Sequence, residues 1–99
     1  MLHIVNKSPF ENSTLGSCLR VAQPGDALLL IEDGIYAATA GSAAESAIRT
    51  ACAALKIFVL KPDMDARGVT QKLIDGVTAV DYGGFVDLTV EYHTSHSWL

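Results

Sequence analysis

The stretch Ala27-Leu28-Leu29-Leu30-Ile31 decides the fold of this chain. An unbroken apolar run of this length is typical of a β-strand that is buried on both faces of a sheet. The Asp33-Gly34 pair that follows predicts a turn that ends the strand. Three more short apolar runs, each followed by turn residues, predict further strands at Leu2–Val5, Lys56–Leu60 and Val77–Val80.

Segments with a helical spacing of apolar residues separate these strands, at Leu15–Ala22, Ala44–Leu55, Met64–Arg67 and Gly84–Tyr92. Strands that alternate with helices predict a parallel sheet with helices on both faces, joined by right-handed crossovers. The 99 residues are the length of one domain. We therefore expect a single α/β domain over residues 1–99.

The composition indicates a subunit of a larger assembly. Hydrophobic residues make up 49% of the chain and charged residues only 18%, against about 25% charged residues in ordinary domains. A small domain has a large surface for its volume, so a shortage of charge leaves apolar patches exposed. Such patches usually mark contacts with other proteins.

Charge and hydropathy exclude several classes of function. The net charge is −4 and basic residues do not cluster, so direct binding to nucleic acid is not expected. The longest uncharged run, residues 34–44, is too short for a membrane span. The first residues lack the features of a signal peptide, and two cysteines form no disulfide framework. We expect a cytoplasmic protein.

The last predicted helix has two apolar sides. Phe85, Leu88 and Tyr92 fall on one stripe that suits the core, whereas Val86 and Val90 form a second stripe. The chain then ends on Trp98-Leu99, two large apolar residues on a terminal segment. We expect Val86, Val90, Trp98 and Leu99 to form an interface with another chain. The alternative is that the tail folds back on its own domain.

Cys18 and Cys52 are the strongest nucleophiles in the chain. Both lie on the apolar sides of predicted helices, where a cysteine usually acts as a small buried hydrophobe. Cys18 lies about 50° from the centre of its apolar stripe, which leaves partial exposure open as the alternative. No Cys-x-x-Cys motif is present, which excludes thioredoxin-like dithiol exchange.

The remaining polar motifs predict no cofactor and no metal site. His93 and His96, with Glu91 before them, have a spacing that could chelate, but histidines on a chain terminus are expected to be solvated. His3 lies in a predicted strand, and we expect it to be hydrogen-bonded in the core. The Gly83-Gly84 pair belongs to no complete phosphate-binding motif, and no spacing indicates a catalytic triad.

The chain resembles the DsrH/TusB family over nearly its whole length. The residues that carry the resemblance are LHIVNKSPF at 2–10, LLIEDGIYAA at 29–38, ARG at 66–68 and DYGGFVDLT at 81–89, with Trp98 near the end. The resemblance implies a three-layer α/β/α sandwich. It also implies a short fifth strand in the segment from Ser95 to Trp98.

The resemblance further implies a role in a cytoplasmic sulfur relay. In that family a DsrH/TusB-like chain assembles with DsrE/TusD-like and DsrF/TusC-like sisters as a dimer of heterotrimers. The complex carries sulfur as a cysteine persulfide and passes it to a DsrC/TusE-like acceptor. The sulfur serves wobble-uridine 2-thiolation of tRNA or dissimilatory sulfur oxidation. A cysteine at position 18, together with the segments Ser8–Glu11 and Asp33–Tyr36, favours the oxidative branch.

The sister that carries the sulfur has its cysteine at a position that matches Leu60-Lys61 here, where no cysteine stands. The resemblance therefore implies an accessory, non-catalytic subunit, with Cys18 as the candidate persulfide carrier if this chain has one. Two alternatives stay open. The chain could transfer sulfur independently through Cys18, or it could be a homo-oligomeric module without sulfur chemistry.

Overall fold

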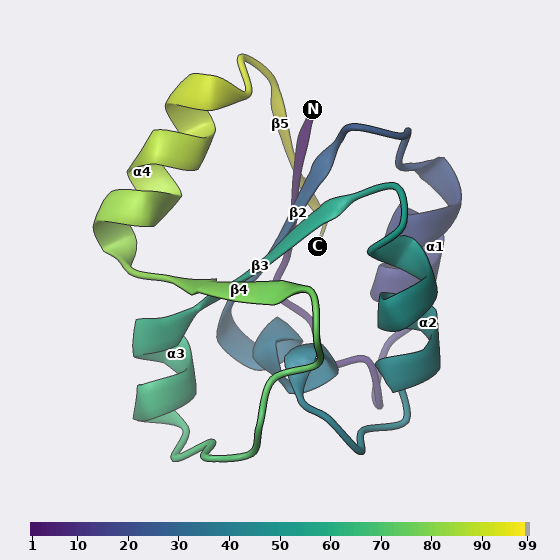
Figure 1. Ribbon diagram of the computed structural model, residues 1–99, viewed down its shortest axis with the longest axis vertical. Helices are drawn as coiled ribbons and strands as arrows, with labels where there is room; N and C mark the ends of the chain where they lie inside the picture. Colours follow the sequence, from purple (N-terminus) through teal and green to yellow (C-terminus); the bar gives the residue numbers. More distant parts are fainter. Residues whose placement is uncertain (99) are drawn as a thin grey trace.

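The computed structural model describes residues 1–98 and contains a five-stranded parallel sheet (Figure 1). The strand order is β4-β3-β2-β1-β5. The strands are β1 (Leu2–Val5), β2 (Ala27–Leu30), β3 (Lys56–Leu60), β4 (Val77–Val80) and β5 (Ser95–Trp98). The predicted strands are thereby confirmed, including the fifth, which pairs in parallel with β1.

Four α-helices and one 3-10 helix connect the strands. Their bounds are α1 (Thr14–Val21), η1 (Glu32–Ala38), α2 (Glu45–Ala51), α3 (Lys61–Ala66) and α4 (Tyr82–Glu91). The prediction that Asp33-Gly34 forms a simple turn is wrong, because both residues belong to η1. No helix among residues 1–98 has the length and hydropathy that crossing a bilayer requires.

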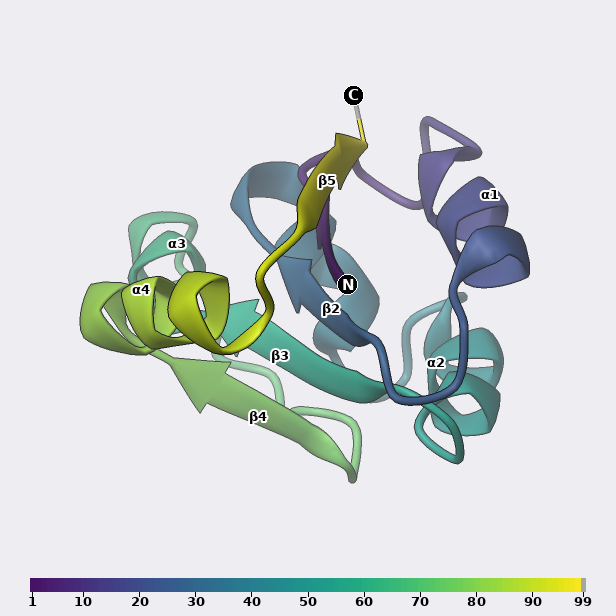
Figure 2. The ribbon, with the colours of Figure 1, turned by 90° about the horizontal axis from the view of Figure 1, so that it is seen from above.

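The helices cover the sheet in two unequal layers, which confirms the α/β/α sandwich. Figure 2 shows α4 on one side of the sheet and α1 and α2 on the other. The larger core cluster joins α1, α2 and η1 to side chains such as Val5, Leu28 and Val59. The smaller cluster joins Leu2, Ile4, Ala27 and Leu29 of the sheet to Leu88 of α4. The α4 side of the sheet therefore has the thinner cover.

A close backbone contact holds the carboxyl ends of β1 and β2 together. The amide of Ile31 donates to the carbonyl of Val5 at 3.0 Å, and Gly34 lies directly against that same carbonyl. A Cβ at position 34 would overlap the Val5 oxygen. Glycine is therefore required here because the two backbones approach so closely.

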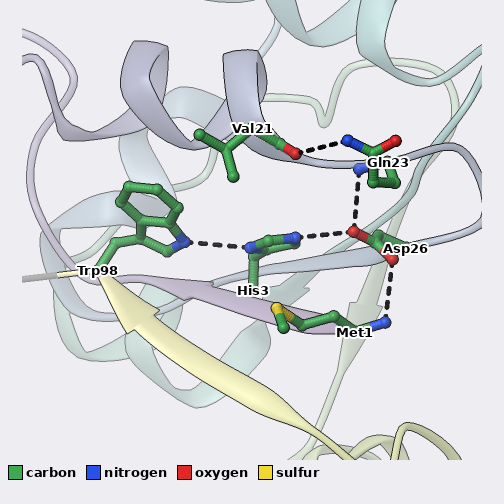
Figure 3. A network of polar contacts seen from close by, with 6 residues as sticks. All are labelled: Met1, His3, Val21, Gln23, Asp26 and Trp98. Atoms are coloured by element: carbon green, nitrogen blue, oxygen red, sulfur yellow. Dashed lines mark hydrogen bonds and ion pairs between the residues drawn. The ribbon is translucent and has the colours of Figure 1, made fainter.

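A buried polar network ties β5 and β1 to the start of β2 (Figure 3). His3 is 2% exposed, and its Nε2 lies 2.9 Å from Oδ2 of Asp26. Nε1 of Trp98 donates to Nδ1 of His3 at 3.1 Å. Because Nδ1 accepts this bond, the neutral ring carries its proton on Nε2, facing Asp26. The expectation that His3 is hydrogen-bonded in the core is confirmed.

Asp26 is the anionic centre of this network. Its oxygens also accept from the amide of Gln23 at 3.0 Å and from the amino group of Met1 at 2.9 Å. Desolvation opposes the charged carboxylate, but these hydrogen bonds and the bond from His3 outweigh it and lower the pKa of Asp26 to about 2. The ionised form of Asp26 therefore stabilises the folded chain.

We predict that Gly34→Ala lowers the free energy of unfolding by about 1–3 kcal/mol, because the Val5 carbonyl belongs to the sheet and cannot move aside. Urea denaturation measures the change. Gly16→Ala is the matched control, since a Cβ at this helical position meets nothing within 4 Å. It should raise the stability by about 0.5–1 kcal/mol. A Gly34→Ala variant as stable as the parent would contradict the close contact.

We predict that Asp26→Asn lowers the free energy of unfolding at pH 7 by about 1–3 kcal/mol, because charged hydrogen bonds are lost. The folded pKa lies below the ordinary value of 3.8, so this stabilisation is present above that value. It is lost as the pH falls toward about 2. Denaturation curves of parent and variant should therefore converge in acid. The exposed Asp75→Asn serves as the control, and a gap that persists at low pH would contradict the role of the Asp26 charge.

Candidate functional site

The outer side of α4 exposes a stripe of large apolar side chains. Tyr82, Val86 and Val90 follow one another at every fourth position and are 61%, 59% and 69% exposed. Residues with this spacing share one side of a helix. We call these three residues the α4 stripe. Exposed apolar side chains in a row on one helix are typical of a surface that another protein covers.

The opposite side of α4 packs against the sheet. Leu88 is buried, and Phe85 and Tyr92 pack against the same core cluster. The predicted division of this helix into a core stripe and a second apolar stripe is therefore confirmed. That Val86 and Val90 contact another chain stays a prediction, which their exposure supports.

Sequence reasoning missed Tyr82 as the third member of the stripe, because it placed the helix start at Gly84. The helix begins earlier because the carboxylate of Asp81 accepts from the amide of Gly84 at 2.8 Å and caps the first turn. An aspartate two residues before a glycine pair was the available signal. With the cap placed at Asp81, Tyr82 falls four residues before Val86.

Trp98 lies differently from the prediction of an exposed anchor. It is half-buried and packs against the core on the α1 side of the sheet, while its indole donates to His3. The cause is the pairing of β5 with β1, which places Trp98 beside Val5. The tail therefore folds back on its own domain as far as Trp98. Leu99 lies outside the described residues, and the interface role of both residues stays a prediction.

Cys18 is fully buried, in line with its interpretation as a small buried hydrophobe and not with the alternative of partial exposure. Its thiol lies on the inner side of α1 in the larger core cluster. Desolvation, and secondly the negative charge of Asp26, raises the pKa of Cys18 to about 11. A thiolate is the species that attacks or carries sulfur. At neutral pH this thiol is therefore protonated and shielded from solvent.

Cys52 follows α2 and is half-buried. Desolvation raises its pKa, and the positive charge of Arg49 only partly offsets this. A Cβ added at Gly76 would lie 3.0 Å from the Cys52 sulfur, so the thiol packs closely against that turn. Cys52 acts as a packing residue, in line with its sequence interpretation.

Leu60 and Lys61, where the family resemblance implied a sulfur-carrying cysteine in a related chain, hold no thiol. Leu60 is buried at the end of β3, and Lys61 opens α3 and pairs with Asp65 at 2.9 Å. His93 and His96 are exposed, as expected for solvated histidines. Within residues 1–98, no group of three or more His, Cys, Asp or Glu side chains is arranged to hold a metal ion.

Comparison with known proteins identifies the family. The profile of the family described as "DsrH like protein" matches residues 7–95. Protein TusB of Pectobacterium parmentieri is 40% identical over 98 residues, which cover 99% of this chain and 100% of that protein. Protein TusB of Shigella flexneri is 35% identical with the same coverage.

Two solved structures share the fold. The ychN protein from E. coli superimposes with a TM-score of 0.82 at 22% identity, over 97% of each chain. MTH1491 from Methanobacterium thermoautotrophicum gives a TM-score of 0.74 at 15% identity, over 97% of this chain and 95% of the other. Since the family profile and the full-length relatives agree with the observed sandwich, this chain belongs to the DsrH/TusB family.

Proposed function

We propose that this chain is an accessory, non-catalytic subunit of a cytoplasmic sulfur-relay complex. Its sister subunits are DsrE/TusD-like and DsrF/TusC-like chains, and the complex hands persulfide sulfur to a DsrC/TusE-like acceptor. The proposal rests on one observation, the exposure of the α4 stripe. Its three large apolar side chains lie on the helix that forms the thinner layer of the sandwich. Membership of the family supplies the identity of the complex.

The thiols support a non-catalytic role. A relay subunit that carries sulfur needs an accessible cysteine of low pKa. Cys18 is fully buried with its pKa raised, and the pKa of Cys52 is raised as well. The chain therefore provides contact surfaces within the complex, while a cysteine of a sister subunit carries the sulfur.

The relatives favour tRNA 2-thiolation over sulfur oxidation as the destination of the sulfur. The sequence alone favoured the oxidative branch through Cys18 and two short segments, but the relatives at 35–40% identity carry the name TusB. Because Cys18 is buried, its presence gives little support to the oxidative branch. The acidic chain has no basic cluster, so we expect it to contact the other proteins of the relay and not the tRNA.

The α4 stripe has the chemistry of an assembly surface. Fully burying a valine-sized side chain stabilises an interface by about 1.5–3 kcal/mol. Asp87 and Glu91 lie next to the stripe and are exposed, which gives the apolar centre a polar rim. Homo-oligomerisation through the same stripe is the alternative for the isolated chain, and co-expression with the sisters distinguishes it.

We predict that Val90→Asp abolishes or weakens assembly with the two sister chains by at least tenfold, because burying an unpaired carboxylate costs more than about 1.4 kcal/mol. Co-expression followed by sizing measures assembly, and circular dichroism checks that the variant remains folded. Val21→Asp is the matched control, since Val21 is 56% exposed on α1, across the sheet from α4. A Val90→Asp chain that assembles normally, or a Val21→Asp chain that fails equally, would contradict the assignment.

We predict that Cys18 in the native chain gains no sulfur from a persulfide donor and reacts with iodoacetamide only slowly. Because the pKa of Cys18 lies near 11, its alkylation rate should rise about tenfold per pH unit from pH 7 through pH 9 without a plateau. Mass spectrometry after digestion reports the rate. The chain unfolded in urea is the control and should react rapidly. A native plateau near pH 8, or a persulfide on native Cys18, would favour the independent sulfur carrier instead.

A further inference from the structure

Two adjoining hollows lie at the carboxyl-terminal edge of the sheet, and both are open to solvent. The first has a volume of about 430 Å³ and lies between the segments 39–42 and 67–71. The second has a volume of about 400 Å³ and lies between Ser8, Glu11 and Asp33. Phe10 and Tyr36 line both hollows. The two hollows therefore adjoin at this aromatic pair, and we call them together the carboxyl-edge groove.

The topology of the sheet explains why a binding site is expected here. All five strands are parallel, so their carboxyl ends lie at one edge of the sheet. In open parallel sheets, ligands bind outside this edge. The groove is built from segments that follow β1, β2 and β3 at this edge.

The charges along the groove favour a cation. Arg67 stands in the larger hollow, but its Nε donates to Oδ1 of Asp33 at 3.0 Å, so this pair neutralises itself. Glu11 then leaves the smaller hollow with a negative charge. The chain as a whole carries −4. An anion would therefore be repelled, while a basic group would be attracted.

The aromatic pair supplies the apolar part of the site. Phe10 is 56% exposed, and its loop is held by a hydrogen bond from its amide to Oγ of Ser8 at 3.2 Å. Tyr36 is half-buried and fixed in η1. An exposed phenylalanine beside a carboxylate can contact both the aliphatic stem and the cationic head of a basic side chain.

We propose that the carboxyl-edge groove binds an extended segment of a partner protein in which a basic residue stands beside an apolar one. The basic side chain lies across Phe10 and pairs with Glu11, and the apolar side chain enters the larger hollow between Tyr36 and Val69. An open groove that runs across two hollows suits an extended chain, whereas small-molecule sites enclose most of the ligand surface. The groove is separate from the α4 stripe. The proposal that the groove binds a peptide segment therefore does not depend on whether the α4 stripe is the assembly surface.

The test uses the full-length chain labelled with ¹⁵N and a blocked peptide, acetyl-Gly-Gly-Arg-Leu-Gly-Gly-amide. We expect saturable amide shifts confined to residues 8–11, 33–42 and 67–71, with a dissociation constant of about 1 mM or below. A peptide with Glu in place of Arg should bind at least tenfold more weakly. Phe10→Ala and Glu11→Gln should each weaken binding several-fold, whereas Val21→Asp, on α1 and outside the groove, should leave it unchanged.

Three results of the peptide titration would overturn the proposal. These are the absence of saturable shifts, equal binding of the Arg and Glu peptides, and shifts centred away from the groove. Binding of acetyl-arginine-amide as tight as that of the peptide would show a site for a small cation and would also contradict it. Because the measurement uses the isolated chain, its outcome does not depend on assembly with the sister subunits.

Discussion

A five-stranded parallel sheet presents apolar side chains on both of its faces, and this chain is short of helices to cover them. In residues 1–98, α1, α2 and η1 pack on one face of the sheet, whereas α4 covers the other face. The inner side of α4 meets Leu2, Ile4 and Leu29 through Leu88. Its outer side is left with the α4 stripe in contact with water. The thin layer, and the surface that it leaves, underlie the proposed role as a subunit.

The small size of the domain also explains where the thiols lie. Each small helix must bury its inner side completely to stabilise so small a core, so the cysteine on α1 is enclosed with Leu15 and Trp98 nearby in one cluster. Enclosure raises the pKa of Cys18 and keeps it protonated. The fold that makes the domain stable thus leaves it without an accessible low-pKa cysteine, which supports the proposal that it contributes to the relay through its surfaces.

The sequence was sufficient for features set by local pattern and insufficient for those set by contacts between distant segments. The apolar runs Lys56–Leu60 and Val77–Val80 coincide with β3 and β4, because chain-breaking residues follow each run within a few positions. The placement of Trp98 depends on the pairing of β5 with β1 and on the indole bond to His3, which joins residues near opposite ends of the described chain. Gly34 of the 3-10 helix after β2 likewise lies against the carbonyl of Val5, a residue of β1. No local pattern reports such long-range contacts.

Hydroxyl-radical footprinting of Tyr82 tests the central claim most directly. The chain is oxidised alone, with an unrelated protein, and with the DsrE/TusD-like and DsrF/TusC-like sisters, and mass spectrometry follows the modification of Tyr82. If the outer side of α4 is the assembly surface, Tyr82 is oxidised in the first two samples and protected several-fold in the third. Equal oxidation of Tyr82 in a complex that has assembled would show that the sisters bind elsewhere and would contradict the account.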